Sequence, residues 1–234
     1  MLAADSQQAW SRVLAGLAYA RRGVMLAACS GVLVLFLGAV SRAGCANPSL
    51  PEVRSLMQYQ DVLFYLALYL GLVMVVGGQW WTALQPGTWS DRAVSLGMGA
   101  LSAVALGILS LVASPGHLPP VDAPPGDSAA LIGAVVGTAA LAGTAMVAMQ
   151  IARQLGDDRL VRSAALFGLA LLAAAAANGE AASGLLFPGP VTGLYVVGAV
   201  AVIDAATCFW LSRLLRRSEA LVRGHLAQAP TGRD

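Results

Sequence analysis

Asp204 is the residue whose type and position could do chemistry, because it lies within the apolar stretch Val191–Leu211. The next basic residue is Arg213, nine positions later. At about 1.5 Å per helical residue, the carboxyl group lies roughly 13 Å from that charged end. Thr207 and Cys208 follow Asp204 at helical spacing and share its face. If this apolar stretch spans a membrane, Asp204 lies near the middle of the bilayer. An ionisable group there is costly and by default suggests a functional site.

Two interpretations of Asp204 follow from this position. Burial away from water disfavours the charged form of a carboxyl group. Asp204 is therefore either a proton or ion site, or a protonated group that donates one interhelical hydrogen bond. We favour the structural role, because no second acidic residue lies at a matching depth. Glu180, just after Asn178, joins this candidate polar site if its helix continues to Phe187, and otherwise reaches the lipid headgroups.

Motifs for catalysis, nucleotide binding or metal binding are absent from the sequence. His117 and His225 are isolated, and the cysteines at 29, 45 and 208 have no metal-binding spacing. Glycines form no phosphate-binding loop, and no serine lies in a nucleophile motif. We therefore expect no catalytic residue, no cofactor and no metal, and a protein that is not an enzyme.

The composition places the chain in a membrane. Hydrophobic residues make up 58% of it and charged residues 11%, whereas soluble domains have about 45–50% and about 25%. The mean hydropathy of +0.72 leaves too few polar residues to cover a water-exposed globule. The net charge of +2 gives no reason to expect a nucleic-acid partner.

Apolar stretches of spanning length predict an all-α, polytopic transmembrane bundle. A helix needs about 20 apolar residues to cross the hydrocarbon core. Each candidate is a continuous apolar run without proline, unlike the short alternating strands of a barrel. The best count is six, and the candidates are Val24–Val40, Val62–Leu84, Ala93–Ala113, Ala129–Ala152, Leu160–Ala177 and Val191–Leu211.

The fourteen arginines predict the orientation of these spans. Twelve fall on one side, at positions 12, 21, 22, 92, 153, 159, 162, 213, 216, 217, 223 and 233. Only Arg42 and Arg54 fall on the other side. The positive-inside rule then predicts that both termini lie on the cytoplasmic side of the membrane. We expect this membrane to be the inner membrane of a bacterium. An odd number of spans would break this agreement.

The predicted domain organisation has three parts, which are an N-terminal segment (1–23), the membrane domain (24–215) and a basic cytoplasmic tail (216–234). Apolar residues at Trp10, Val13, Leu14 and Leu17 share one helical face of the first part. This part is either a helix lying in the inner headgroup region or an extension of the first span.

Cleavage of the first 46 residues as a signal peptide is the alternative to an uncleaved first helix. A small-residue site ends at Ala46. Arg42 would lie just before the cleavage point, which favours the uncleaved helix.

Small and aromatic residues predict how the helices pack. Gly133 and Gly137 form a GxxxG motif in the fourth span, where a neighbouring backbone can approach closely. This groove is either a dimerisation seam or, as we favour, internal bundle packing. Trp80, Trp81 and Trp89 are expected to anchor the second and third spans at the inner interface.

Three segments resemble a group of uncharacterised multi-pass membrane proteins of high-GC bacteria, namely Trp10–Gly23, Trp81–Ser95 and Ile151–Ala164. The resemblance implies a fold of about six spans and no particular activity.

The function expected from the sequence is that of a non-enzymatic structural or accessory membrane subunit. Its partners would be the lipid bilayer and either another membrane protein or further copies of itself. The alternative is a small transporter or channel with Asp204 as its proton or ion site. A third possibility is a membrane sensor whose arginine-rich tail meets anionic lipid or a cytoplasmic partner.

Overall fold

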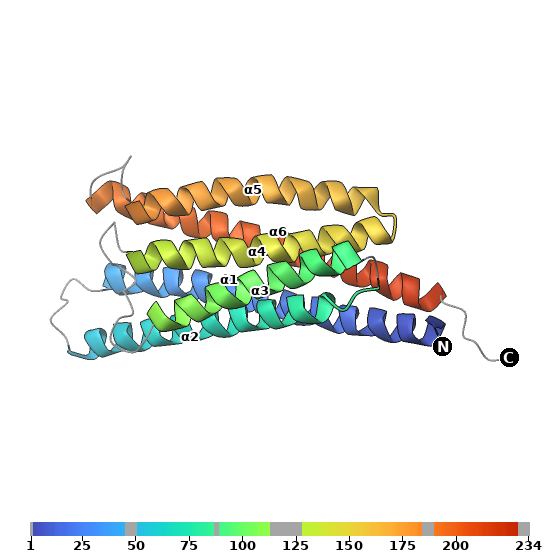
Figure 1. The fold of residues 1–234 in the computed structure, drawn as a ribbon. Helices are drawn as coiled ribbons and strands as arrows, with labels where there is room; N and C mark the ends of the chain where they lie inside the picture. The colour runs from blue at the N-terminus through green and yellow to red at the C-terminus, as the bar shows by residue number, and fades with distance from the viewer. Residues whose placement is uncertain (1, 45–50, 87–88, 113–127, 184–189, 229–234) are drawn as a thin grey trace.

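The fold is a bundle of long helices (Figure 1). The computed structural model describes residues 2–44, 51–86, 89–112, 128–183 and 190–228, and within these ranges it contains six α-helices and no strand. The helices are α1 (Leu2–Gly44), α2 (Pro51–Thr82), α3 (Trp89–Val112), α4 (Ser128–Gln154), α5 (Asp158–Ser183) and α6 (Pro190–Gln228). The predicted all-α class is confirmed. Each predicted apolar stretch falls on a different helix, apart from one or two end residues.

The helices run back and forth along one axis (Figure 1). α1 packs against α2 and α6, and α4 contacts α2, α3, α5 and α6. α1 begins and α6 ends at the same end of the bundle, where α2 and α4 also end and α3 and α5 begin (Figure 1). We call this the NC end.

The turn between α4 and α5 at the NC end is built by two local signals. Gly156 adopts φ 75°, the left-handed conformation that ends many helices. Asp157 then caps α5, because its Oδ1 accepts the backbone N–H groups of Arg159 at 3.0 Å and Leu160 at 2.9 Å. These two residues reverse the chain and place α5 antiparallel to α4.

The N-terminal segment is continuous with the first predicted span. α1 is 43 residues long, which at about 1.5 Å per residue makes it roughly 64 Å long. A bilayer with its headgroups is about 40–45 Å thick, so α1 is longer than a span requires. Trp10, Val13 and Leu17 are buried in the bundle. Residues 2–23 and the first predicted apolar stretch thus form one continuous helix.

The predicted tail from residue 216 also remains helical, because α6 continues to Gln228. Its buried residues recur every three or four positions and form one stripe, made up of Leu211, Leu214, Leu215, Ser218 and Val222. This stripe packs into the bundle core together with residues of α1. The structure thus places residues 216–228 in a packed helix, while residues 229–234 lie outside the described residues.

Close packing of α1 on α2 depends on glycine. A Cβ atom at Gly23 would lie 2.5 Å from the carbonyl oxygen of Gly71, and one at Gly78 would lie 2.6 Å from that of Gly16. Such distances are too short for any side chain, so the two backbones touch at both levels. By contrast, a Cβ atom at Gly137 would meet no atom within 4 Å.

The close contact predicted around Gly133 and Gly137 is therefore not seen at Gly137. The surroundings of Gly133 lie outside the described residues. Among the described residues of α4, a closer approach is seen at Gly143, where a Cβ atom would lie 3.1 Å from the amide nitrogen of Gln79.

Among the described residues, one stretch is long and apolar enough to span a membrane. It is Asp158–Asn178 of α5, with a mean hydropathy of 1.9. Its leucines at 166, 169 and 172 are 57%, 65% and 67% exposed. Side chains in several other predicted spans, including Val24–Val40, lie partly outside the described residues. The structure thus establishes a helical bundle, in which one described stretch meets the requirements of a membrane span.

Candidate functional site

Asp204 joins α6 to α5 through one hydrogen bond. Its Oδ1 accepts from the amide nitrogen of Asn178 at 2.8 Å. The same amide donates to the carbonyl oxygen of Ala174 at 3.0 Å. Asp204 is half-buried. This is a polar contact between two helices, as expected for a structural role of Asp204. The carboxyl group accepts the hydrogen bond, however, whereas the sequence predicted a protonated carboxyl group that donates it.

The other predicted polar residues do not assemble around Asp204. Thr207 donates its hydroxyl to the carbonyl oxygen of Ile203 at 2.7 Å, within its own helix. Cys208 is a buried free thiol one turn after Asp204. The side chain of Glu180 lies outside the described residues. In the part of the chain that the structure describes, no three His, Cys, Asp or Glu side chains are grouped to hold a metal.

A buried polar network links α2, α3 and α4 near the NC end. Ser95 donates to Gln150 Oε1 at 2.7 Å, and the amide nitrogen of Gln85 lies 3.3 Å from the Ser95 hydroxyl and 3.4 Å from the same Gln150 oxygen. One layer deeper, Gln79 donates to Thr144 at 2.9 Å and to the carbonyl oxygen of Ala140 at 2.8 Å. These contacts fix the relative positions of three helices.

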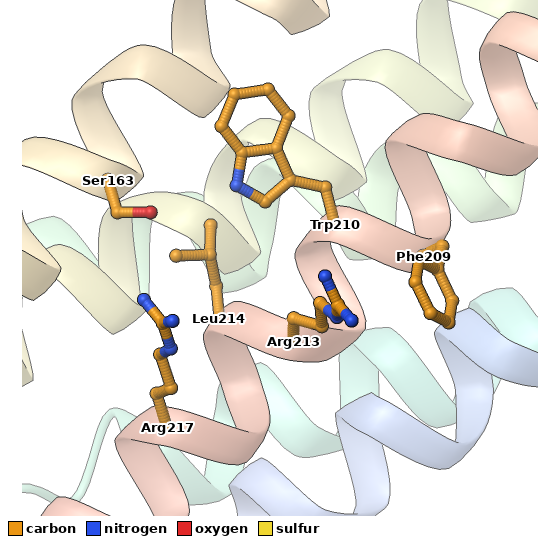
Figure 2. Close-up of a pocket in the computed structure, with 6 residues that line it drawn as sticks. All are labelled: Ser163, Phe209, Trp210, Arg213, Leu214 and Arg217. Atoms are coloured by element: carbon orange, nitrogen blue, oxygen red, sulfur yellow. The ribbon is translucent and has the colours of Figure 1, made fainter.

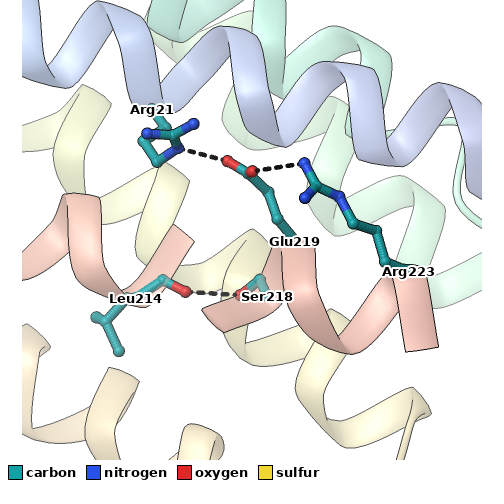
Figure 3. Close-up of polar contacts among 5 residues, drawn as sticks. All are labelled: Arg21, Leu214, Ser218, Glu219 and Arg223. Carbon is teal, nitrogen blue, oxygen red and sulfur yellow. Dashed lines mark hydrogen bonds and ion pairs between the residues drawn. The ribbon is translucent and has the colours of Figure 1, made fainter. Parts of the chain in front are cut away.

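An ion-pair cluster connects the two ends of the chain (Figure 3). Arg21 of α1 donates its Nε–H to Glu219 Oε1 at 2.6 Å, and Arg223 reaches Oε2 at 3.4 Å. The Glu219 side chain is only 4% exposed, whereas that of Arg21 is 33% exposed. A carboxylate buried this deeply is costly unless paired. The pair therefore joins the N-terminal half of α1 to the C-terminal half of α6.

A basic groove lies between α5 and α6 (Figure 2). Its cavity volume is about 240 Å³, and its lining residues are Ser163, Phe209, Trp210, Arg213, Leu214 and Arg217. Trp210, Arg213, Leu214 and Arg217 follow each other at helical spacing on one face of α6.

Polar groups in this groove have free hydrogen-bonding capacity. The hydroxyl of Ser163, the indole nitrogen of Trp210 and the guanidinium group of Arg217 point to the space beside Leu214 (Figure 2). Within the described ranges, none of these three donors has a protein acceptor. Arg213 has no carboxylate partner there either, and stacks its guanidinium carbon 4.9 Å from the Phe209 ring centre.

Aromatic packing fixes the shape of the groove. The rings of Phe167 and Trp210 meet edge to face, with centres 5.9 Å apart and planes at 85°. Phe167 is fully buried. Such T-shaped pairs are a preferred aromatic geometry, so the orientation of the Trp210 indole is set by the core of the bundle.

Two charged features of the structure were not predicted from the sequence, the Arg21–Glu219 pair and the groove between α5 and α6. Glu219 lies within the predicted basic tail, and its pairing depends on α1 lying beside α6. The groove depends on which helix face carries each arginine, which the side of the membrane does not show. The spacing of Trp210, Arg213 and Arg217 was the available signal.

Comparisons with protein-family models, with curated proteins and with solved structures returned no match to this chain. The resemblance to multi-pass proteins of high-GC bacteria therefore stays a prediction.

Proposed function

We propose that this chain is an integral protein of the bacterial inner membrane, with six spans and both termini in the cytoplasm. It serves there as a non-enzymatic structural or accessory subunit. The non-enzymatic role rests on the sequence, which carries no motif for catalysis or for a cofactor.

The observation that carries the proposal is the distribution of arginine over the bundle. Eleven of the fourteen arginines lie in helix segments toward the NC end, at positions 12, 21, 22, 92, 153, 159, 162, 213, 216, 217 and 223. Arg42 and Arg54 belong to the far ends of α1 and α2. In a membrane, a surplus of arginine marks the cytoplasmic side, so the NC end would face the cytoplasm.

The outer surface of α5 supports contact with lipid. Leu166, Leu169 and Leu172 are all more than half exposed and follow each other at helical spacing. An exposed apolar stripe of this length is unfavourable in water. In a bilayer it faces acyl chains at no cost, which is why we place α5 at the lipid boundary.

The exposed arginines of the NC end support the accessory role, because they offer a surface to a cytoplasmic partner. The α4–α5 turn carries Arg153, Arg159 and Arg162, all exposed. α1 and α6 extend beyond it as a helix pair joined by Arg21 and Glu219 (Figure 1). A rigid basic projection of this kind suits an acidic partner surface.

The alternative of a small transporter or channel requires Asp204 to exchange a proton or an ion. The hydrogen bond from Asn178 supports the structural role instead, because it uses the carboxyl group to join two helices. We therefore keep Asp204 as a packing residue in the proposal.

Fractionation tests the membrane assignment. The full-length chain, expressed in a bacterial host, should remain in the membrane pellet after alkaline carbonate extraction and dissolve only in detergent. Release of the chain into the carbonate supernatant would contradict the proposal.

A further inference from the structure

We propose that the groove between α5 and α6 binds the phosphate group of an anionic phospholipid. This inference rests on the membrane location proposed above and adds a ligand that the location alone does not imply. It concerns the groove lined by Ser163, Trp210, Arg213 and Arg217.

The donors in the groove match a phosphate group. Arginine forms charge-assisted hydrogen bonds with phosphate oxygens through a planar set of N–H groups. Arg217 brings such a group to the space that Ser163 and the Trp210 indole also face (Figure 2). A hydroxyl, an indole N–H and a guanidinium group together offer more donors than acceptors, which is the chemistry of an anion site.

The acidic groups near the groove do not pair with its arginines, Arg213 and Arg217. The buried carboxylate of α6, Glu219, is already paired with Arg21 and Arg223. Asp157 accepts the first N–H groups of α5. No acidic side chain lines the groove itself. Among the described residues, neither Arg213 nor Arg217 forms an ion pair with a carboxylate, so both guanidinium groups are available to a ligand.

Exposed apolar side chains on the two helices that form the groove indicate a lipid as the source of the phosphate. Leu166 and Leu169 of α5 are 57% and 65% exposed, and Phe209 of α6, which lines the groove, is 53% exposed. Acyl chains could lie along these side chains while the headgroup occupies the groove. A soluble phosphate would make no use of this apolar surface.

The depth of the groove agrees with a headgroup position. Ser163 lies five positions after the start of α5, which at about 1.5 Å per residue is roughly 8 Å from the cytoplasmic end of that helix. Headgroups occupy such a layer at each face of a bilayer. Arg213 and Arg217 near this level would also experience the negative potential of anionic lipids.

Native mass spectrometry of the detergent-purified full chain tests the proposal. The protein is incubated with equal amounts of phosphatidylglycerol and phosphatidylcholine, and the bound fraction of each is measured. We expect preferential phosphatidylglycerol adducts in the wild type. Arg213→Gln/Arg217→Gln should lower this fraction about tenfold, since it removes two charged hydrogen-bond donors. Arg216→Gln, a neighbouring exposed arginine outside the groove, should change it less than about twofold.

A second variant keeps the test decisive if the double variant fails to fold. Ser163→Leu fills the groove without changing any charge, and should reduce phosphatidylglycerol binding while leaving phosphatidylcholine binding unchanged. Equal adducts in Ser163→Leu, the double variant and Arg216→Gln would overturn the proposal.

Competition with inorganic phosphate distinguishes the two sources of the anion. Excess inorganic phosphate should leave the phosphatidylglycerol adducts in place. Their complete displacement would assign the groove to a soluble anion and overturn the proposal of a lipid ligand. Carbonate extraction judges the membrane location separately, so failure of the groove and failure of the proposed function give different results.

Discussion

Arg21 and Glu219 form an ion pair of 2.6 Å across 198 residues of sequence. It ties the first helix to the last and makes one rigid unit of two segments that together carry seven of the fourteen arginines. In the proposed topology, this unit is the part of the protein that projects into the cytoplasm. Its stability therefore decides whether a partner meets an ordered surface.

Removing Arg21 should destabilise the bundle. Arg21→Met leaves the buried Glu219 with only the longer contact to Arg223, at 3.4 Å. We expect a loss of about 1–3 kcal/mol, the usual cost of leaving a buried polar group underpaired. Arg22→Met is the matched control, because Arg22 is exposed and has no partner among the described residues. Scanning fluorimetry in detergent measures both, and equal unfolding temperatures would contradict the role of the pair.

A methyl group at Gly78 should separate α1 from α2. In Gly78→Ala the new Cβ would lie 2.6 Å from both the Cβ of Ala20 and the carbonyl oxygen of Gly16. Overpacking of this kind costs about 1–3 kcal/mol. Gly97→Ala is the control, since no atom lies within 4 Å of that position and alanine stabilises a helix by up to about 1 kcal/mol over glycine. An unchanged or raised unfolding temperature for Gly78→Ala would show that the helices do not touch there.

Two buried serines of α3 should respond differently to the loss of their hydroxyl groups. Ser95 donates to Gln150 at 2.7 Å, whereas the Ser102 hydroxyl is buried without a partner in the described part of the chain. Ser95→Ala should cost about 1 kcal/mol, and Ser102→Ala should be neutral or stabilising. Chemical denaturation of the two variants in parallel measures the difference. A larger loss of stability in Ser102→Ala than in Ser95→Ala would contradict these assignments.

Asp204→Asn should leave the bundle intact, because an asparagine oxygen can still accept the hydrogen bond from Asn178. Asp204→Leu should be less stable by about 1–3 kcal/mol, since the Asn178 donor loses this partner. Proteoliposomes loaded with a pH-sensitive dye then separate the structural role from transport. We expect the same proton leak for wild type and Asp204→Asn, and an Asp204-dependent flux would favour the transporter.

The helices themselves could be predicted from the sequence, because long apolar runs without proline and without an alternating polar pattern favour helices over strands. Proline and polar segments between the runs placed most helix ends within a few residues of the observed ends, but α2 begins at Pro51, eleven residues before the predicted Val62. The lengths of α1 and α6 were not predictable in this way. Their extensions are held by contacts with each other, such as Trp10 against His225 at 5.4 Å between ring centres.

Helix neighbours were harder to predict than helices. Glycine spacing pointed to Gly133 and Gly137 of α4, whereas the shortest glycine contacts among the described residues join Gly16 and Gly23 of α1 to Gly71 and Gly78 of α2. In each helix the two glycines are seven residues, or about two turns, apart. A single sequence shows such repeats but not which helix lies opposite them.

The candidate site was predictable in part. Asp204 was identified from its depth in an apolar stretch, and its partner Asn178 lies at the matching depth of the preceding helix. The groove and the Arg21–Glu219 pair depend on the contacts of α6 with α5 and α1, which no local pattern specifies.

Reporter fusions along the chain test the central claim of six spans most directly. A cytoplasm-active fluorescent reporter should be active after Gln85, Gly156 and Gln228, which follow or end α2, α4 and α6. Alkaline phosphatase, which is active only outside, should be active after Gly44, Val112 and Ser183, the ends of α1, α3 and α5. This alternation is the predicted result. A single change of side at α5, with all earlier fusions on one side, would contradict it and leave one span.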